Sequence, residues 1–321
     1  MDKYLVVDRI EYVVTYLCNS KCSHCQIAEE KRNTLPSHID RDKAVEIIRK
    51  ISRMRVPKSV MTFGGEPLLY PEIVCAVHQE AKRAGIPVRD VITNGFWSTK
   101  PEKIKQISQR LARSGVNEVA VSVDCFHQEF VRLKIVERAA AALVEAGIAR
   151  VRWNPCWVVS KDHANKYNRR TKEILKRLHA LHVEESGGNS VQPQGRALSS
   201  LAEFLPARKS VPVGKCGDAP YTEPLDSIKT ISIEPDGKVA VCKNFYIGNT
   251  FQTGIMDILD GYDPFEIPEA ESILEKDMEG LINWAKKRGV EPKPEGYHSI
   301  CHMCTDLRER AGTTTPGFLP H

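Results

Sequence analysis

Three cysteines near the start of the chain have the spacing of metal ligands. The segment Cys18-Asn-Ser-Lys-Cys22-Ser-His-Cys25 follows the first apolar run of the sequence. Three thiolates on one loop cannot fill the four ligand positions of a zinc or iron–sulfur site. If the loop binds a 4Fe–4S cluster, one iron has no protein ligand and a small molecule can coordinate it. A zinc knuckle or a chance group of cysteines is the alternative interpretation.

A second group of cysteines with ligand-like spacing occurs in the last third of the chain. Its members are Cys216, Cys242, Cys301 and Cys304. Unlike the first group, it has the four ligands that a closed site needs. Ten cysteines in a chain without a secretion signal argue against a disulfide framework and favour metal binding or catalysis.

The composition is that of an ordinary globular protein and argues against a membrane-spanning, secreted or nucleic-acid-binding protein. The 321 residues are enough for one large domain and a smaller one, and the net charge is only +5. No apolar run approaches the roughly 18 residues that a membrane helix needs, and the N-terminus lacks the features of a signal peptide. We therefore expect a cytoplasmic protein without a membrane partner. The densest basic segment, 166–177, has a helical pattern, which favours a solvated face over a nucleic-acid site.

Strand and helix patterns alternate over the first two thirds of the chain. Strands are predicted at 11–15, 59–63, 88–93, 118–124, 150–159 and from 183; helices are predicted after Asp40 and at 72–84, 101–113, 134–146 and 166–181. A period near 30 residues indicates βαβ units and a parallel sheet. Six units are too few for a full barrel and predict an α/β partial (β/α)6 barrel, a partial TIM barrel, with its active site at the C-terminal strand edge.

The composition changes after residue 195. Residues 228–242 predict a hairpin with the turn Pro235-Asp236-Gly237, and residues 268–288 predict a helix. We therefore expect two domains, 1–210 and 211–321.

Polar and glycine residues follow the predicted strands, where a parallel sheet places its functional groups. Gly64-Gly65-Glu66-Pro67 follows the second strand and Thr93-Asn94-Gly95 the third, while Ser122 and Asp124 end the fourth. Glycines allow close approach of the backbone, and a glutamate can accept hydrogen bonds from a cationic amine. The alternative is that the Asn94 segment is only a turn and Asp124 a helix cap.

Together, CNSKCSHC and GGEP resemble the motifs of the radical S-adenosylmethionine (radical SAM) superfamily. The resemblance implies that Cys18, Cys22 and Cys25 bind an open 4Fe–4S cluster. It also implies that the cofactor S-adenosylmethionine contacts His24, Gly64, Gly65, Glu66, Asn94, Ser122, Asp124 and Arg196. His24 stands where the family usually has an aromatic residue near the adenine. Arg196, in Pro-Gln-Gly-Arg-Ala, would pair with the cofactor carboxylate or hold the domain junction.

The second cysteine group resembles the auxiliary-cluster domains called SPASM and, in shortened form, twitch. Gly237 precedes Cys242 in the predicted hairpin, and Ile247-Gly248-Asn249 follows. The resemblance implies a second 4Fe–4S cluster, closed by Cys216, Cys242, Cys301 and Cys304. The 20 residues between Cys216 and Gly237 exceed the usual family spacing. A zinc ion held by the same four cysteines is the structural alternative.

The resemblance implies a metal-binding oxidoreductase. A reductant such as flavodoxin or ferredoxin supplies an electron, S-adenosylmethionine is cleaved to a 5′-deoxyadenosyl radical, and the radical abstracts a hydrogen atom from a substrate. The closed cluster would then accept an electron from the substrate radical. Peptide modification and small-molecule dehydrogenation compete, and the alternative class is a non-enzymatic zinc-binding interaction protein. Cys125 and Cys156 are candidate hydrogen-atom donors, or simply small buried hydrophobes.

Overall fold

The computed structural model describes residues 4–33, 35–178, 183–242 and 245–312. The chain divides into two compact units. The larger is Glu11–Leu205, and the smaller combines the described parts of Met1–Ile10 and Pro206–His321. Strand β1 (Leu5–Thr15) begins in the smaller unit and ends in the larger one.

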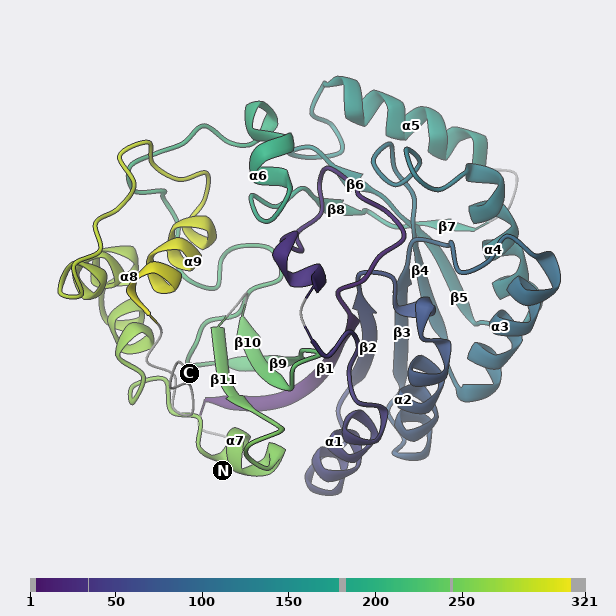
Figure 1. Ribbon diagram of the computed structural model, residues 1–321, viewed down its shortest axis with the longest axis horizontal. Coiled ribbons are helices and arrows are strands. Elements are labelled where there is room, and N and C mark those ends of the chain that lie inside the picture. Colours follow the sequence, from purple (N-terminus) through teal and green to yellow (C-terminus); the bar gives the residue numbers. More distant parts are fainter. Residues whose placement is uncertain (1–3, 34, 179–182, 243–244, 313–321) are drawn as a thin grey trace. The chain divides into compact units, whose positions relative to one another are not determined.

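The larger unit is built on a parallel sheet covered by helices (Figure 1). Its strands run in the order β1-β2-β3-β4-β5-β7, and each neighbouring pair from β2 to β7 is parallel. The strands are β2 (Ser59–Gly64), β3 (Val88–Thr93), β4 (Glu118–Ser122), β5 (Arg150–Asn154) and β7 (Glu184–Glu185). The helices are α1 (Arg41–Met54), α2 (Pro71–Arg83), α3 (Pro101–Ser114), α4 (Leu133–Glu145) and α5 (Lys166–Leu178). The predicted α/β fold with a parallel sheet is confirmed and is consistent with a partial barrel.

Helix α1 illustrates how local sequence positions these elements. Its buried side chains, Ala44, Ile47, Ile48 and Ile51, recur at helical spacing and form one apolar face. Asp40 precedes the helix, and its carboxylate accepts a hydrogen bond from the Lys43 backbone N–H at 2.7 Å. This N-cap satisfies a donor that the first turn leaves without an intrahelical partner.

The predicted strand 150–159 is divided in two by Pro155. Strand β5 ends at Asn154, and the short β6 (Cys156–Trp157) pairs instead with β8 (Asn189–Ser190). Proline has no backbone N–H, so it cannot donate to the sheet and interrupts the ladder there. Helix α5 is described as far as Leu178, and the last predicted positions of that helix, 179–181, lie outside the described residues.

The smaller unit contains an antiparallel sheet and helices. Strands β9 (Ile228–Ile233), β10 (Lys238–Cys242) and β11 (Phe245–Asn249) are consecutive, which confirms the predicted hairpin. Its helices are α7 (Ile255–Asp260), α8 (Pro268–Lys286) and α9 (Ile300–Ala311). The sequence predicts α8 but not β11, α7 or α9. A further short helix, α6 (Ala197–Ser200), belongs to the larger unit. Among the helices of the described residues, none is both long and apolar enough to cross a membrane.

A partly buried arginine joins three strands of the parallel sheet. The guanidinium of Arg152 on β5 lies 2.7 Å from a carboxylate oxygen of Asp90 on β3 and 2.8 Å from one of Glu118 on β4. Only 15% of the Arg152 side chain is exposed. Removing it would leave two poorly hydrated carboxylates without their shared cation.

We therefore expect Arg152→Met to lower the free energy of unfolding by about 3 kcal/mol, measured by urea denaturation. The matched control is Arg170→Met, which breaks the exposed Arg170–Glu173 pair and should have almost no effect. Equal changes in the two variants would contradict this account.

Candidate functional site

The Cys18–Cys25 loop leaves the end of β1 at the carboxyl edge of the parallel strands. A tight turn closes it, in which the Cys25 backbone N–H donates to the Cys22 carbonyl at 3.1 Å. Cys22 is buried, and Cys18 and Cys25 are partly exposed. Burial, with the nearby Glu66 carboxylate, raises the pKa of Cys18 to about 11, and burial also raises the pKa of Cys22. These thiols therefore need a nearby cation before they can ionise at neutral pH.

Gly64, the last residue of β2, and Gly65 bring the end of that strand against the start of the cysteine loop. The backbone N–H of Gly65 donates to the Thr15 carbonyl at 2.7 Å, and that of Glu66 donates to the Leu17 carbonyl at 2.8 Å. A Cβ at Gly65 would lie 2.0 Å from the Leu17 carbonyl oxygen, and Gly64 has a φ of +129°. A side chain does not fit at either position, because Gly65 packs directly against the Leu17 carbonyl and Gly64 has a positive φ.

The Glu66 carboxylate ties the ends of β2 and β3 together. It is fully buried and accepts hydrogen bonds from the Thr93 hydroxyl at 2.7 Å and from the backbone N–H groups of Asn94 and Leu68 at 2.8 and 3.0 Å. Burial raises the pKa of Glu66 to about 7, although these hydrogen bonds oppose the shift. Its contact with the amino group of S-adenosylmethionine stays a prediction.

Two N–H donors point at sulfur atoms of the loop. The side-chain amide of Asn94 donates to Cys18 Sγ at 3.7 Å and to the side-chain oxygen of Asn19 at 2.7 Å. Arg32 donates to Cys25 Sγ at 3.8 Å. Such donors typically orient metal-bound ligands from outside the coordination sphere. Asn94 is thus placed beside the cysteine loop, and Arg32 is a site residue that the sequence analysis missed.

Asp124 organises the turn after β4. It is fully buried, and its two carboxylate oxygens accept from His127 Nδ1 at 2.8 Å and from the backbone N–H groups of Cys156, Phe126 and His127. Burial alone would raise the pKa of Asp124, but the charge and hydrogen bonds of His127 outweigh it and lower the pKa to about 2. The carboxylate therefore holds β4, β6 and His127 together, and its contact with S-adenosylmethionine stays a prediction.

His24 is packed against this turn. Its ring centroid lies 4.8 Å from the rings of both Phe126 and His127. Burial lowers the pKa of His24 to about 4, so the ring is neutral at neutral pH. Its Nδ1 is buried and has no hydrogen-bond partner among the described residues. His127 was missed by the sequence analysis, although it follows Asp124 by three residues in Asp-Cys-Phe-His.

One sulfur and two imidazoles converge at this point. Donor atoms of Cys22, His24 and His127 lie within 4.8 Å of one another. Ser122 ends β4 and is buried two residues before Asp124. The structure thus brings the cysteine loop together with residues that follow β2, β3 and β4, as expected for one edge of a parallel sheet.

Arg196 anchors the cysteine loop from the other end of the larger unit's sequence. Its guanidinium donates to the Lys21 carbonyl at 3.0 Å and forms an ion pair with Glu29. Its backbone N–H donates to the Cys25 carbonyl at 3.0 Å. These contacts identify Arg196 as a residue that positions the loop, while its pairing with the cofactor carboxylate stays a prediction.

Cys125 and Cys156 are both buried beside the Asp124 turn. Burial raises the pKa of Cys125 to about 12 and raises that of Cys156 as well. Both therefore carry their S–H hydrogen at neutral pH, and their role as hydrogen-atom donors stays a prediction.

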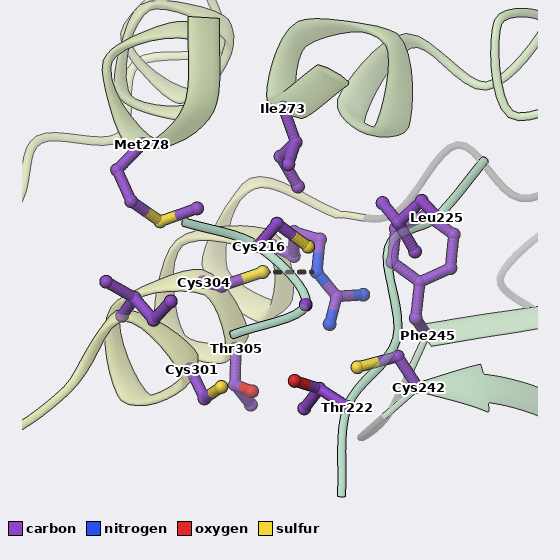
Figure 2. A pocket seen from close by; sticks show the side chains of 13 residues that line it. Cys216, Thr222, Leu225, Cys242, Phe245, Ile273, Met278, Cys301, Cys304 and Thr305 are labelled. Atoms are coloured by element: carbon purple, nitrogen blue, oxygen red, sulfur yellow. Dashed lines mark hydrogen bonds between the residues drawn. The ribbon is translucent and has the colours of Figure 1, made fainter. Parts of the chain in front are cut away.

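The four cysteines of the second group line one pocket of the smaller unit (Figure 2). Cys216 comes from an irregular segment, Cys242 from the end of β10, and Cys301 and Cys304 from the first turns of α9. Apolar side chains complete much of the lining: Leu225, Phe245, Ile273, Met278 and Ile300. Burial raises the pKa of Cys216, and the other three thiolates raise it further. Four thiols in an apolar pocket, whose ionised forms would repel one another, are a donor set that suits a metal ion.

The fold and the cysteine loop define a class of enzyme that uses an iron–sulfur cluster. The family model described as "Radical SAM superfamily" matches residues 12–192, more than half of the chain. This chain belongs to the radical SAM superfamily and is a radical SAM enzyme.

Sequence relatives share a shorter segment. GTP 3′,8-cyclase of Limosilactobacillus fermentum is 28% identical over 124 residues, which are 38% of this chain and 35% of that protein. GTP 3′,8-cyclase of Chlorobaculum tepidum is 29% identical over 38% of this chain and 34% of that protein. The chain therefore matches about a third of the length of these relatives. The solved structure of "native anSMEcpe with bound AdoMet" has a TM-score of 0.53 at 13% identity and covers 96% of this chain and 97% of that one, which shows a shared fold.

Membership in the superfamily implies S-adenosylmethionine and one 4Fe–4S cluster. The residues present fit these groups. Cys18, Cys22 and Cys25 are free thiols on one loop, burial raises the pKa of Cys18 and Cys22, and the buried Nδ1 of His24 lacks a partner among the described residues. The three thiols leave one iron of such a cluster for the cofactor.

Replacing Gly65 should separate the cysteine loop from the end of β2, because the added Cβ overlaps the Leu17 carbonyl. We expect Gly65→Ala to reduce 5′-deoxyadenosine formation roughly a hundredfold in reconstituted protein. Gly187→Ala is the control, since a Cβ there meets nothing within 4 Å. Unchanged product formation in Gly65→Ala would show that this contact does not position the loop.

Proposed function

We propose that this chain is a radical SAM oxidoreductase whose smaller unit binds a second, closed 4Fe–4S cluster in a SPASM- or twitch-like domain. The observation that carries the proposal is the convergence of Cys216, Cys242, Cys301 and Cys304 on one apolar pocket. Three separate segments contribute these thiols, so their convergence is a property of the fold rather than of a local motif. The proposed domains are 1–210 and 211–321.

The bound groups supply a 5′-deoxyadenosyl radical and a store for one electron. The chain's own residues hold the cysteine loop, exclude water and orient the cofactor. Four cysteine ligands leave no iron open, so a substrate could bind the second cluster only by displacing a ligand. Electron transfer is therefore the use that best suits it, and it favours a net two-electron oxidation of the substrate, with a flavodoxin- or ferredoxin-type reductant.

A purine nucleotide is a second candidate substrate. The sequence relatives are named for a reaction of GTP, which supports this candidate alongside a peptide or another small molecule. The interpretation as a non-enzymatic zinc-binding protein receives no support from the family match. A zinc ion bound by all four cysteines of the second pocket remains the alternative for that pocket alone.

Metal content separates these alternatives. We expect anaerobically reconstituted protein to be brown and to hold about eight irons per chain, two clusters of four. About four irons with one zinc would contradict the second cluster. Elemental analysis with sulfide determination is the measurement.

Single cysteine replacements separate the two sites. We expect Cys22→Ala to abolish 5′-deoxyadenosine formation, because the first cluster loses one of only three ligands. Cys242→Ala should retain this cleavage if the second cluster only transfers electrons, while oxidation of the substrate is lost. Loss of cleavage in Cys242→Ala with a fully loaded first cluster would argue against that division of roles.

The nucleotide candidate is tested by adding GTP to the reduced enzyme with S-adenosylmethionine. Stimulation of 5′-deoxyadenosine formation, with a new product derived from GTP, would support it. ATP serves as the matched control. The absence of both GTP binding and stimulation in fully loaded enzyme would remove GTP from consideration.

A further inference from the structure

A buried arginine lies against the second cysteine group. Arg308 is on α9, four residues after Cys304, and only 3% of it is exposed. Its Nε–H donates to Cys304 Sγ at 3.4 Å, the hydrogen bond drawn as a dashed line in Figure 2. Residues four apart on a helix share a face, so the helix presents the thiol and the guanidinium to the same pocket.

The groups around Arg308 favour its positively charged form. Its guanidinium carbon lies 4.6 Å from the ring centroid of Phe245, which also lines the pocket. Burial lowers the pKa of Arg308, but the thiolates of Cys304 and Cys242 and the carboxylate of Glu269 raise it, and the net shift is upward. An arginine cannot be deprotonated under these conditions, so the pocket contains a permanent positive charge.

Each of the four thiolates adds negative charge in an environment that hydrates it poorly. A single buried cation with a directed N–H is well suited to offset part of that charge.

We propose that Arg308 raises the reduction potential of the iron–sulfur cluster held by Cys216, Cys242, Cys301 and Cys304. This inference rests on the second cluster of the proposed function. Reduction adds one negative charge to the cluster, and a nearby cation stabilises the more negative state more strongly. A hydrogen bond to a cluster sulfur acts in the same direction, and both effects increase when water is excluded. Arg308 thus makes the cluster a better electron acceptor.

A purely structural role makes a different prediction. If Arg308 only packs against Phe245, its replacement lowers the stability of the smaller unit and leaves the potential unchanged. The reduction potential is therefore the measurement that distinguishes the two roles.

The test is a redox titration of full-length protein monitored by electron paramagnetic resonance. The Cys18, Cys22 and Cys25 residues are first changed to Ala, so that the second cluster alone gives the signal. In this background we expect Arg308→Gln to lower the midpoint potential by at least about 59 mV, a tenfold change in the one-electron equilibrium. Arg308→Lys keeps the charge but loses the planar donor, and it should give a smaller decrease.

Arg310→Gln is the matched control. Arg310 lies two residues further along α9, and its guanidinium pairs with Asp306 at 2.6 Å rather than with a cysteine. The Arg310→Gln substitution removes the same charge from the same helix, and we expect it to leave the reduction potential of the cluster unchanged. An equal decrease in Arg308→Gln and Arg310→Gln would overturn the specific role of Arg308, and so would an unchanged potential in Arg308→Gln.

Iron analysis separates failure of this inference from failure of the proposed function. If the triple-alanine protein binds no iron–sulfur cluster, the proposed second cluster is wrong. If it binds about four irons and no variant changes the potential, only the role of Arg308 is wrong. If Arg308→Gln does not retain iron, the Arg308→Lys variant decides the question. A reduction potential below that of the triple-alanine protein supports the inference, and an unchanged potential overturns it.

Discussion

A thiolate buried away from water is unfavourable unless a cation lies close to it, and both cysteine groups of this chain are subject to that constraint. Burial raises the pKa of Cys18, Cys22 and Cys216, so these residues are neutral thiols until a metal displaces their protons. The rest of each site consists of the residues that hold the thiols in place and the few donors that point at sulfur. Metal binding by either group would therefore be coupled to folding.

The first site is held by backbone contacts and buried carboxylates. Gly64 and Gly65 seat β2 against the backbone that enters the cysteine loop, Glu66 joins β2 to β3, and Asp124 joins β4 to β6 and to His127. Each contact lies after the end of a parallel strand. The residues for which the family resemblance implies cofactor contacts therefore also support the cysteine loop. Precise positioning of a reactive group requires such support.

The second site is held by one helix and one hairpin. Helix α9 provides Cys301, Cys304 and Arg308, because positions three and four apart share a helical face. Hairpin strand β10 brings Cys242, and an irregular segment brings Cys216. The first group offers three thiols and the second offers four. A four-iron cluster on the first would leave one iron for a small molecule, whereas the cluster proposed for the second would have a cysteine on every iron.

Much of this protein was determined by local sequence. The alternation of strands and helices, the N-cap at Asp40, the hairpin turn that ends at Gly237 and the spacing of Cys18, Cys22 and Cys25 are all short-range patterns, and each predicted its element or motif. The strand break at Pro155 was missed, although the missing N–H of a proline is a local signal of such a break. Helix α9 was missed because its buried and exposed residues do not separate into a clear apolar face.

Only the tertiary structure decided which distant residues meet. The contacts of Asp124 with Cys156, of Arg196 with the Cys18–Cys25 loop, and of Phe245 with Arg308 join residues far apart in the chain. The sequence alone could identify Glu66 as an acceptor, but not that Thr93 and Asn94 already donate to it. Spacing along the chain determines local geometry, whereas burial depends on how the elements pack, and burial shifts the pKa values of His24, Glu66 and Cys216.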